Sequence, residues 1–263
     1  MRSDPPWRKC LLLRAENLFR RFGGVSALEA VDLALAAGEV HAVIGPNGAG
    51  KTTLLNVLSG IYRPDAGDIW LEERRLAGRA AHEFAAAGIA RTFQNLQVFF
   101  NMSALENVMA GRWLRARCSL ASTLLHLGNF RRAERQCRAA AERLLDEVGL
   151  SRWRDAPADA MPYGALKRLE IARALAAGPK LLLLDEPAAG LNPGETREID
   201  ELIRRIAARG VTVVLVEHNM QLVMGVSDHV VVLDYGRKLA DGDPRSVSAD
   251  PRVVEAYLGA GAC

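Results

Sequence analysis

A glycine-rich stretch constrains the fold of this chain more than any other feature. Residues 45–53 run Gly-Pro-Asn-Gly-Ala-Gly-Lys-Thr-Thr and match the pattern G-x-x-x-x-G-K-[ST] of a phosphate-binding loop, or P-loop. The mostly apolar residues 40–44 before it favour a buried strand, and residues 54–58 after it favour a helix that ends near Gly60. A strand, a glycine loop and a helix in this order predict an α/β sheet that binds phosphate at one edge.

The residue types in this loop suit a nucleoside triphosphate. Its glycines let the backbone wrap closely around a phosphate and point N–H groups at it. The N-terminus of the following helix adds about half a positive elementary charge. We expect Lys51 to reach the β and γ phosphates of the nucleotide and the Thr52 hydroxyl to ligate Mg²⁺. The predicted nucleotide-binding residues here are Gly45, Pro46, Asn47, Gly48, Ala49, Gly50, Lys51, Thr52 and Thr53.

Composition narrows the class of protein that carries this loop. With 263 residues the chain has room for one large domain or two small ones, and its 49% hydrophobic share can bury a sizeable core. Apolar runs stay below the ~18 residues of a membrane helix, and the N-terminus lacks the apolar segment of a secretory leader. Four scattered cysteines suit a reducing cytosol. A net charge of +3 is too small to indicate nucleic acid, which we do not expect as a partner.

Two regions of the sequence favour antiparallel strands. Residues 11–36 alternate apolar and polar side chains in short runs around a Phe-Gly-Gly turn at 22–24. Residues 230–233 and 238–240 flank an Asp-Tyr-Gly turn, which predicts a hairpin near the C-terminus.

Three apolar runs predict the parallel part of a sheet. Residues 40–44, 181–184 and 211–216 are almost entirely apolar, as expected of strands covered on both faces. The segment between the first two, at 95–159, is rich in Arg, Ala and Leu and has helical periodicity. We therefore expect these three strands in one sheet, with a helical block inserted between the first and the second.

Helix signals complete this outline. The best helix of the inserted block is predicted at 131–148, with Gly149 as its stop, and another at 162–177. At 192–195 the stretch Asn-Pro-Gly-Glu combines a capping residue, proline at the first helical position and Glu three residues after the cap. The helix that follows ends near Gly210.

The predicted fold class is α/β, with a P-loop NTPase core built on a mostly parallel sheet. An antiparallel β subdomain and an inserted helical subdomain complete it. We expect a single nucleotide-binding domain over 1–263, in which 1–94 and 160–263 form the core and 95–159 the helical subdomain.

Acidic and histidine side chains follow two of the predicted parallel strands. Asp185 and Glu186 end the apolar run at 181–184, and His218 lies just past the run at 211–216. Because ligands bind at the carboxyl ends of parallel strands, we expect all three beside the phosphates. Asp185 is placed to hold Mg²⁺, Glu186 to orient or deprotonate the attacking water, and His218 to contact the γ-phosphate. A solvated acidic pair and a structural histidine are the alternatives.

The order of these motifs resembles the nucleotide-binding subunits of ABC transporters, over residues 12–259. By this resemblance, Gln94 is the glutamine that touches Mg²⁺ or water and senses a membrane partner. Phe22 is similar to the aromatic residue that stacks on adenine, although a core Phe is the alternative. Residues 189–192, Ala-Gly-Leu-Asn, resemble the D-loop, with Asn192 where many members have Asp.

The signature motif departs from the family. The usual Leu-Ser-Gly-Gly-Gln is replaced at 161–165 by Met-Pro-Tyr-Gly-Ala, while the continuation at 166–175 keeps the family pattern. Gly164 still lets the backbone approach a phosphate, and Tyr163 stands beside it, but Pro162 supplies no N–H. The resemblance implies a head-to-tail dimer in which Tyr163 and Gly164 face the other subunit's ATP.

Several stretches are similar to the importers of branched-chain (hydrophobic) amino acids, and to the larger of their two ATPase subunits. They lie at 162–164, 188–196, 216–220, 111–149 and 232–238. The resemblance implies ATP and Mg²⁺ as cofactors, a second ATPase subunit, two transmembrane permease subunits and, indirectly, a substrate-binding protein. It places the chain peripherally on the cytoplasmic face of the inner membrane.

Other functions remain open at this point. Importers of urea, amides or aromatic acids have similar sequences, as do the ATPases of lipopolysaccharide exporters. A soluble ABC ATPase that acts on DNA or ribosomes, and a P-loop kinase, are more distant alternatives. An arginine-rich block is either a solvated helical face or a surface that meets anionic headgroups or a membrane subunit. Its members are Arg112, Arg115, Arg117, Arg131, Arg132, Arg135 and Arg138.

Overall fold

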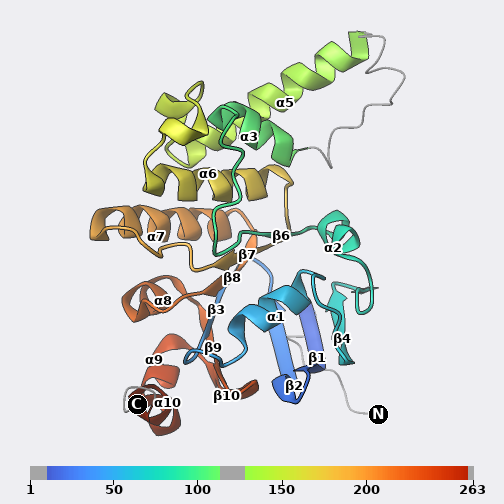
Figure 1. The fold of residues 1–263 in the computed structure, drawn as a ribbon, viewed down its shortest axis with the longest axis vertical. Coiled ribbons are helices and arrows are strands. Elements are labelled where there is room, and N and C mark those ends of the chain that lie inside the picture. The colour runs from blue at the N-terminus through green and yellow to red at the C-terminus, as the bar shows by residue number, and fades with distance from the viewer. Residues whose placement is uncertain (1–10, 113–127, 260–263) are drawn as a thin grey trace. The chain divides into compact units, whose positions relative to one another are not determined.

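The computed structural model describes residues 11–112 and 128–259 (Figure 1). The chain divides into two compact units, which are described separately. We call Met1–Arg91 with Lys180–Cys263 the sheet unit, and Thr92–Pro179 the helical unit. Arg115, Arg117, His126 and three cysteines, at positions 10, 118 and 263, lie outside the described residues.

The sheet unit is built on a six-stranded sheet of order β10-β9-β3-β8-β7-β6, parallel except for β10. Every residue of β3, β7 and β8 is buried, which confirms the parallel strands predicted from their apolar runs. The hairpin predicted near the C-terminus is β9–β10. The strands are β3 (Val40–Ile44), β6 (Ile89–Arg91), β7 (Leu181–Asp185), β8 (Thr212–Val216), β9 (His229–Asp234) and β10 (Arg237–Gly242).

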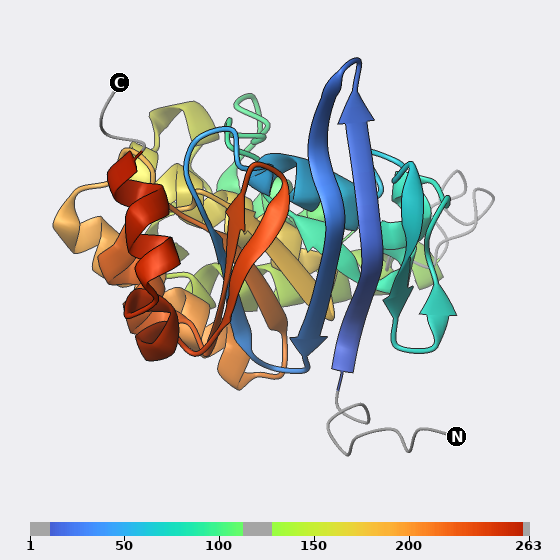
Figure 2. The ribbon, with the colours of Figure 1, turned by 90° about the horizontal axis from the view of Figure 1, so that it is seen from below.

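A second, antiparallel sheet of order β2-β1-β4-β5 lies in the same unit. Figure 2 shows its long strands β1 and β2 beside the β9–β10 hairpin, and β10 contacts β2. The first two strands were predicted, whereas β4 and β5 were not, because Gly67 and Asp68 interrupt the apolar pattern of β4 and β5 consists of two arginines. The bounds are β1 (Leu11–Phe22), β2 (Val25–Ala36), β4 (Ala66–Leu71) and β5 (Arg74–Arg75).

Helix α1 (Lys51–Leu58) joins the two sheets into one core. Its side chains Leu54, Leu55 and Leu58 are fully buried against residues of both sheets. The helix begins at Lys51, three residues earlier than the apolar run indicates, because Gly50 takes the left-handed conformation just before it. This start puts Lys51 and Thr52 in the first turn, next to the glycine loop.

The sheet unit contains further helices besides α1. Asn192 caps α7 through its side chain, with Pro193 at the first helical position, as predicted. Helices α2, α8, α9 and α10 were not predicted, since each is short. The bounds are α2 (Ala81–Ala87), α7 (Pro193–Ala208), α8 (Met220–Val226), α9 (Pro244–Ser248) and α10 (Pro251–Gly259).

The helical unit contains α3 (Ala104–Gly111), α5 (Gly128–Glu147) and α6 (Tyr163–Ala176), with short 3-10 turns at Ser151–Trp153 and Ala158–Ala160. The expected boundary of 95–159 is narrower than this unit, which also includes α6. The reason is packing, because α6 contacts both α3 and α5. A methyl group on Gly111 would lie 2.2 Å from the carbonyl oxygen of Arg173, so α3 and α6 approach closely.

Candidate functional site

The P-loop forms a tight backbone cradle between β3 and α1. Gly45, Gly48 and Gly50 have φ angles of 148°, 80° and 101°. A Cβ at Gly45 would lie 2.1 Å from the carbonyl oxygen of Leu233, and one at Gly50 would lie 2.4 Å from that of Ala27. Glycine is therefore required at both positions, by backbone conformation and by space. This geometry fits a phosphate group held by backbone N–H groups at the start of a helix.

Lys51 is held inside the loop. Its ammonium donates to the carbonyl oxygens of Gly45, at 2.8 Å, and Pro46, at 2.9 Å. Burial lowers the pKa of Lys51, while the negative charges of Glu186 and Asp185 raise it. The acidic pair is thus close enough to interact with Lys51, as the position at the carboxyl ends of the strands predicts. Thr52, one residue on, is exposed and can present its hydroxyl to a ligand.

Asp185, at the end of β7, is buried and held by an arginine that the sequence analysis missed. Arg91, the last residue of β6, places its Nη2 atom 2.9 Å from the Oδ2 atom of Asp185. Its Nη1 atom donates to the Asn56 side chain at 2.6 Å and to the Ser59 hydroxyl at 3.1 Å. Arg91 therefore connects the acidic pair to α1. The feature of the sequence that could have pointed to Arg91 is its position three residues before Gln94.

Glu186 and His218 form the pair most suited to activating water. Glu186 has a φ of 49°, an uncommon conformation for a residue with a side chain, and its N–H donates to the Val216 carbonyl at 2.9 Å. The Nε2 atom of His218 lies 3.1 Å from the Oε1 atom of Glu186. A carboxylate oriented by an imidazole fits a base that positions water. The sequence predicted both residues at this edge but not their contact.

Glu217 is a third carboxylate at this edge, and the sequence analysis missed it. It is buried, and it accepts the N–H groups of Ala188, at 2.8 Å, and His218, at 3.1 Å. Burial raises the pKa of Glu217, backbone N–H donors lower it, and the charge of Glu186 raises it further. Glu217 thus joins the segment after β7 to the backbone of His218.

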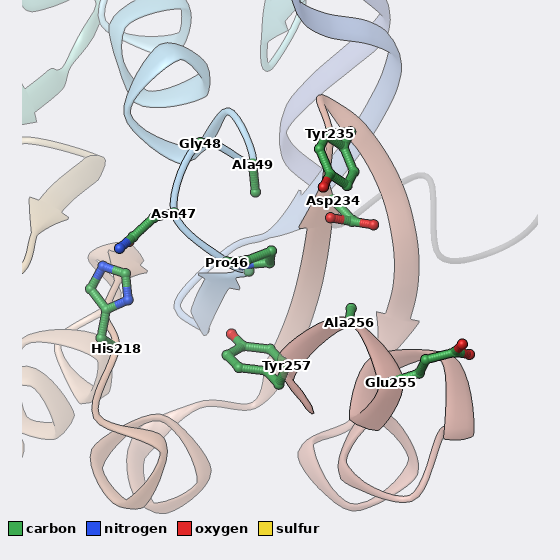
Figure 3. A pocket seen from close by; sticks show the side chains of 11 residues that line it. Pro46, Asn47, Gly48, Ala49, His218, Asp234, Tyr235, Glu255, Ala256 and Tyr257 are labelled. Carbon is green, nitrogen blue, oxygen red and sulfur yellow. The ribbon is translucent and has the colours of Figure 1, made fainter. Parts of the chain in front are cut away.

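A cavity of about 580 Å³ opens beside the loop (Figure 3). In Figure 3 the phenol of Tyr257, on α10, points into the cavity beneath the loop, and Tyr235 marks the β9–β10 turn. Burial raises the pKa of Tyr257, while the backbone N–H of Gly45 lowers it, so the phenol lies against the loop. Tyr235 is 85% exposed. The lining residues are Gly45, Pro46, Asn47, Gly48, Ala49, His218, Asp234, Tyr235, Glu255, Ala256 and Tyr257.

Phe22, the predicted adenine platform, lies at the end of β1. It is 41% exposed and packs edge-on against Tyr62 with 5.3 Å between ring centroids. The guanidinium of Arg20 lies 4.8 Å from the centre of the Phe22 ring. An exposed ring argues against the alternative of a core Phe, but Phe22 is not among the residues that line the cavity. Its stacking on adenine stays a prediction.

Gln94, Tyr163 and Gly164 belong to the helical unit, so their part in the site stays a prediction. Gln94 lies in an exposed coil after β6. Tyr163 is the first residue of α6 and is 45% exposed, whereas Gly164 is buried. Pro162 caps α6 without a side-chain hydrogen bond, in contrast to the serine expected in the usual signature.

Among the described residues, no group of three or more His, Cys, Asp or Glu side chains could hold a metal ion. The protein groups near the loop that suit a hard cation are the Thr52 hydroxyl and the Asp185 carboxylate. In the same part of the chain, no helix is long and apolar enough to cross a membrane.

The site and fold together define an ATP-binding cassette, with a P-loop, an acidic pair after β7 and a histidine after β8. A family model described as "ABC transporter" matches residues 28–189. A second model, described as "Branched-chain amino acid ATP-binding cassette transporter", matches residues 237–263. The chain belongs to the ABC transporter family and is one of its ATP-hydrolysing subunits. Within that family it groups with the branched-chain amino acid transport ATP-binding proteins.

Relatives support this assignment over nearly the full chain. The high-affinity branched-chain amino acid transport ATP-binding protein BraF of Pseudomonas aeruginosa is 42% identical, over 94% of this chain and 98% of its own length. The lipopolysaccharide export system ATP-binding protein LptB of Acidithiobacillus ferridurans is 38% identical, over 94% and 97%. A crystal structure of the ADP conformation of an ABC transporter cassette matches with a TM-score of 0.82 and 34% identity, over 95% and 99%. The predicted fold class is confirmed.

Proposed function

We propose that this chain hydrolyses ATP to drive the import of branched-chain or related amino acids. The observation that carries the chemistry is the contact between His218 and Glu186 at 3.1 Å, at the strand edge that also holds the P-loop. The transported class is supported by the similarity to BraF and by the branched-chain model that covers the C-terminal residues.

The proposed catalytic cycle uses Mg²⁺ with ATP. Thr52 and Asp185 would hold the cation, which would neutralise charge on the phosphates, and Gln94 would reach it or the attacking water. Lys51 leaves its two carbonyl partners for the phosphates, and Glu186, oriented by His218, positions the water. The exposed Thr52 and the electrostatic contact of Lys51 with the acidic pair support these roles.

The proposed partners are a second ATPase subunit, two transmembrane permease subunits and, indirectly, a substrate-binding protein. The ATPase subunits pair head to tail, so that Tyr163 and Gly164 of one complete the ATP site of the other, while Phe22 stacks on adenine. The chain then acts as the larger ATPase subunit on the cytoplasmic face of the inner membrane. Exposed Tyr163 at the start of α6 supports a contact made outside its own subunit.

Purification from membranes in mild detergent tests this function. We expect two multi-span subunits and a different, smaller ATPase to copurify, with ATP turnover that rises when the cognate binding protein carries a branched-chain amino acid. The similarity to LptB favours lipopolysaccharide export as the second candidate. Copurification of two copies of this chain with lipid-export components would replace the import proposal with that one.

A further inference from the structure

Helix α6 carries two buried charged side chains in the helical unit. Lys167 is 1% exposed and Glu170 is 4% exposed. Buried charges are unfavourable unless hydrogen bonds or opposite charges compensate for lost hydration. Their presence in an otherwise apolar helix face therefore calls for partners, and those of Glu170 lie in the segment that carries Gln94.

The Glu170 carboxylate binds backbone N–H groups on both sides of Gln94. Its Oε1 atom accepts the N–H of Phe93 at 3.2 Å. Burial raises the pKa of Glu170, while the N–H groups of Phe93 and Gln97 and the charge of Lys167 lower it. One donor is the residue before Gln94 and the other is three residues after it.

The far end of the same segment is held from α3. The buried Asn107 side chain accepts the N–H of Phe99 at 2.8 Å and donates to its carbonyl at 3.0 Å. Arg173 of α6 lies 5.0 Å from the centre of the Phe99 ring. An exposed coil is thus fixed by side chains rather than by a strand or helix of its own. Near Gln94 itself, Glu170 is one side chain that does this.

We propose that Glu170 is a positioning residue that fastens the backbone around Gln94 to α6. The proposal rests on the proposed function for the role of Gln94 in hydrolysis. Because α6 begins with the altered signature, any movement of that helix is transmitted through the Glu170 carboxylate to Gln94. A segment without the regular backbone hydrogen bonds of a helix or strand depends on side chains such as Glu170 for its conformation.

Hydrogen exchange on the purified full chain tests the structural part. In Glu170→Ala the amides of Phe93 and Gln97 lose their acceptor, and we expect exchange in residues 92–98 to accelerate about tenfold or more. Glu170→Gln keeps the shape and one acceptor oxygen, so its exchange should be intermediate. The control is Glu106→Ala, which removes the exposed α3 capping box of the same unit and should leave residues 92–98 unchanged. Unchanged exchange in Glu170→Ala overturns the proposal whatever the protein transports.

Turnover in the membrane complex tests the link to Gln94. We expect Glu170→Ala to lower kcat severalfold with a KM for ATP within twofold of wild type, and Glu170→Gln to recover part of the loss. If Glu170 acts through Gln94, adding Glu170→Ala to Gln94→Ala lowers kcat no further. Full additivity of the two losses overturns the positioning role. A Gln94→Ala variant with wild-type kcat contradicts the proposed catalytic cycle instead, and exchange alone then decides whether Glu170 holds the segment.

Discussion

The phosphate loop and the Gln94 segment are both irregular stretches next to a strand, yet they are fixed in different ways. In the loop, positive-φ glycines and close backbone contacts set the conformation. In the Gln94 segment, Glu170 and Asn107 reach in from two helices and hold an exposed coil. The difference teaches that a motif fixed by its own backbone shows its geometry in its sequence, whereas a motif held by distant side chains does not.

The largest effect is expected from a variant that changes the chemistry at the strand edge. This variant leaves unchanged the backbone contacts of the loop and the side chains that hold the Gln94 segment. Glu186→Gln keeps the shape of the side chain and its contact distance to His218 but removes the charge that orients or deprotonates water. We expect kcat for ATP hydrolysis to fall ~10²–10⁴-fold with ATP still bound. A steady-state ATPase assay with a nucleotide-binding assay measures both. The exposed Glu198→Gln serves as the control, and wild-type turnover in Glu186→Gln would remove Glu186 from the proposed role.

The next effect concerns β3, the strand that leads into the loop. A buried histidine near the end of β3 remote from the loop makes the stability of the fold depend on pH. His41 is buried, and burial together with the nearby His229 lowers its pKa from 6.5 to about 4. The unfolded chain therefore binds a proton between these values that the folded chain does not, so stability falls as pH falls from 6.5 to 4. We expect a loss of about 3 kcal/mol from this residue. Denaturant unfolding of wild type and His41→Gln between pH 7 and 4 measures it, and parallel pH profiles would contradict it.

The third effect tests whether the loop binds nucleotide through its lysine as well as through its backbone. Lys51→Ala removes a charge-assisted interaction with the phosphates, of about 1.5–3 kcal/mol. We expect the Kd for ATP to rise roughly 10–100-fold, as measured by calorimetry. Lys180→Ala is the matched control, because that lysine pairs with Glu72 on the surface. Equal Kd values for wild type and Lys51→Ala would mean that the loop is not the nucleotide site.

The smallest effect asks whether the loop also depends on a distant side chain, as the Gln94 segment does. Tyr257→Phe removes the hydroxyl that lies against Gly45, and we expect the KM for ATP to rise about two- to fivefold with kcat nearly unchanged. Tyr235→Phe, in the same cavity but 85% exposed, should have no effect. An unchanged KM in Tyr257→Phe would mean that the loop, unlike the Gln94 segment, does not depend on a distant side chain. Equal changes in both variants would contradict a specific contact of Tyr257.

Much of the fold could be predicted because its elements have local signals. Continuous apolar runs predicted β3, β7 and β8, and the Asn-Pro capping pattern predicted α7. Short elements such as β5 and α8 carry too few residues for a period to appear. The expected helical subdomain of 95–159 is narrower than the helical unit, because α6 joins that unit through packing contacts, which the sequence does not show.

The sequence by itself determined the glycine loop and the positions of the acidic pair and the histidine directly after two parallel strands. The apolar runs of those strands and the conformational freedom of glycine are local properties. Only the tertiary structure decided which side chains hold these groups. Arg91 on Asp185, His218 on Glu186 and Glu170 on the Gln94 segment join residues 32 to 94 positions apart. Such contacts form when elements pack, because a buried charge needs a partner that the fold, and not the neighbouring sequence, supplies.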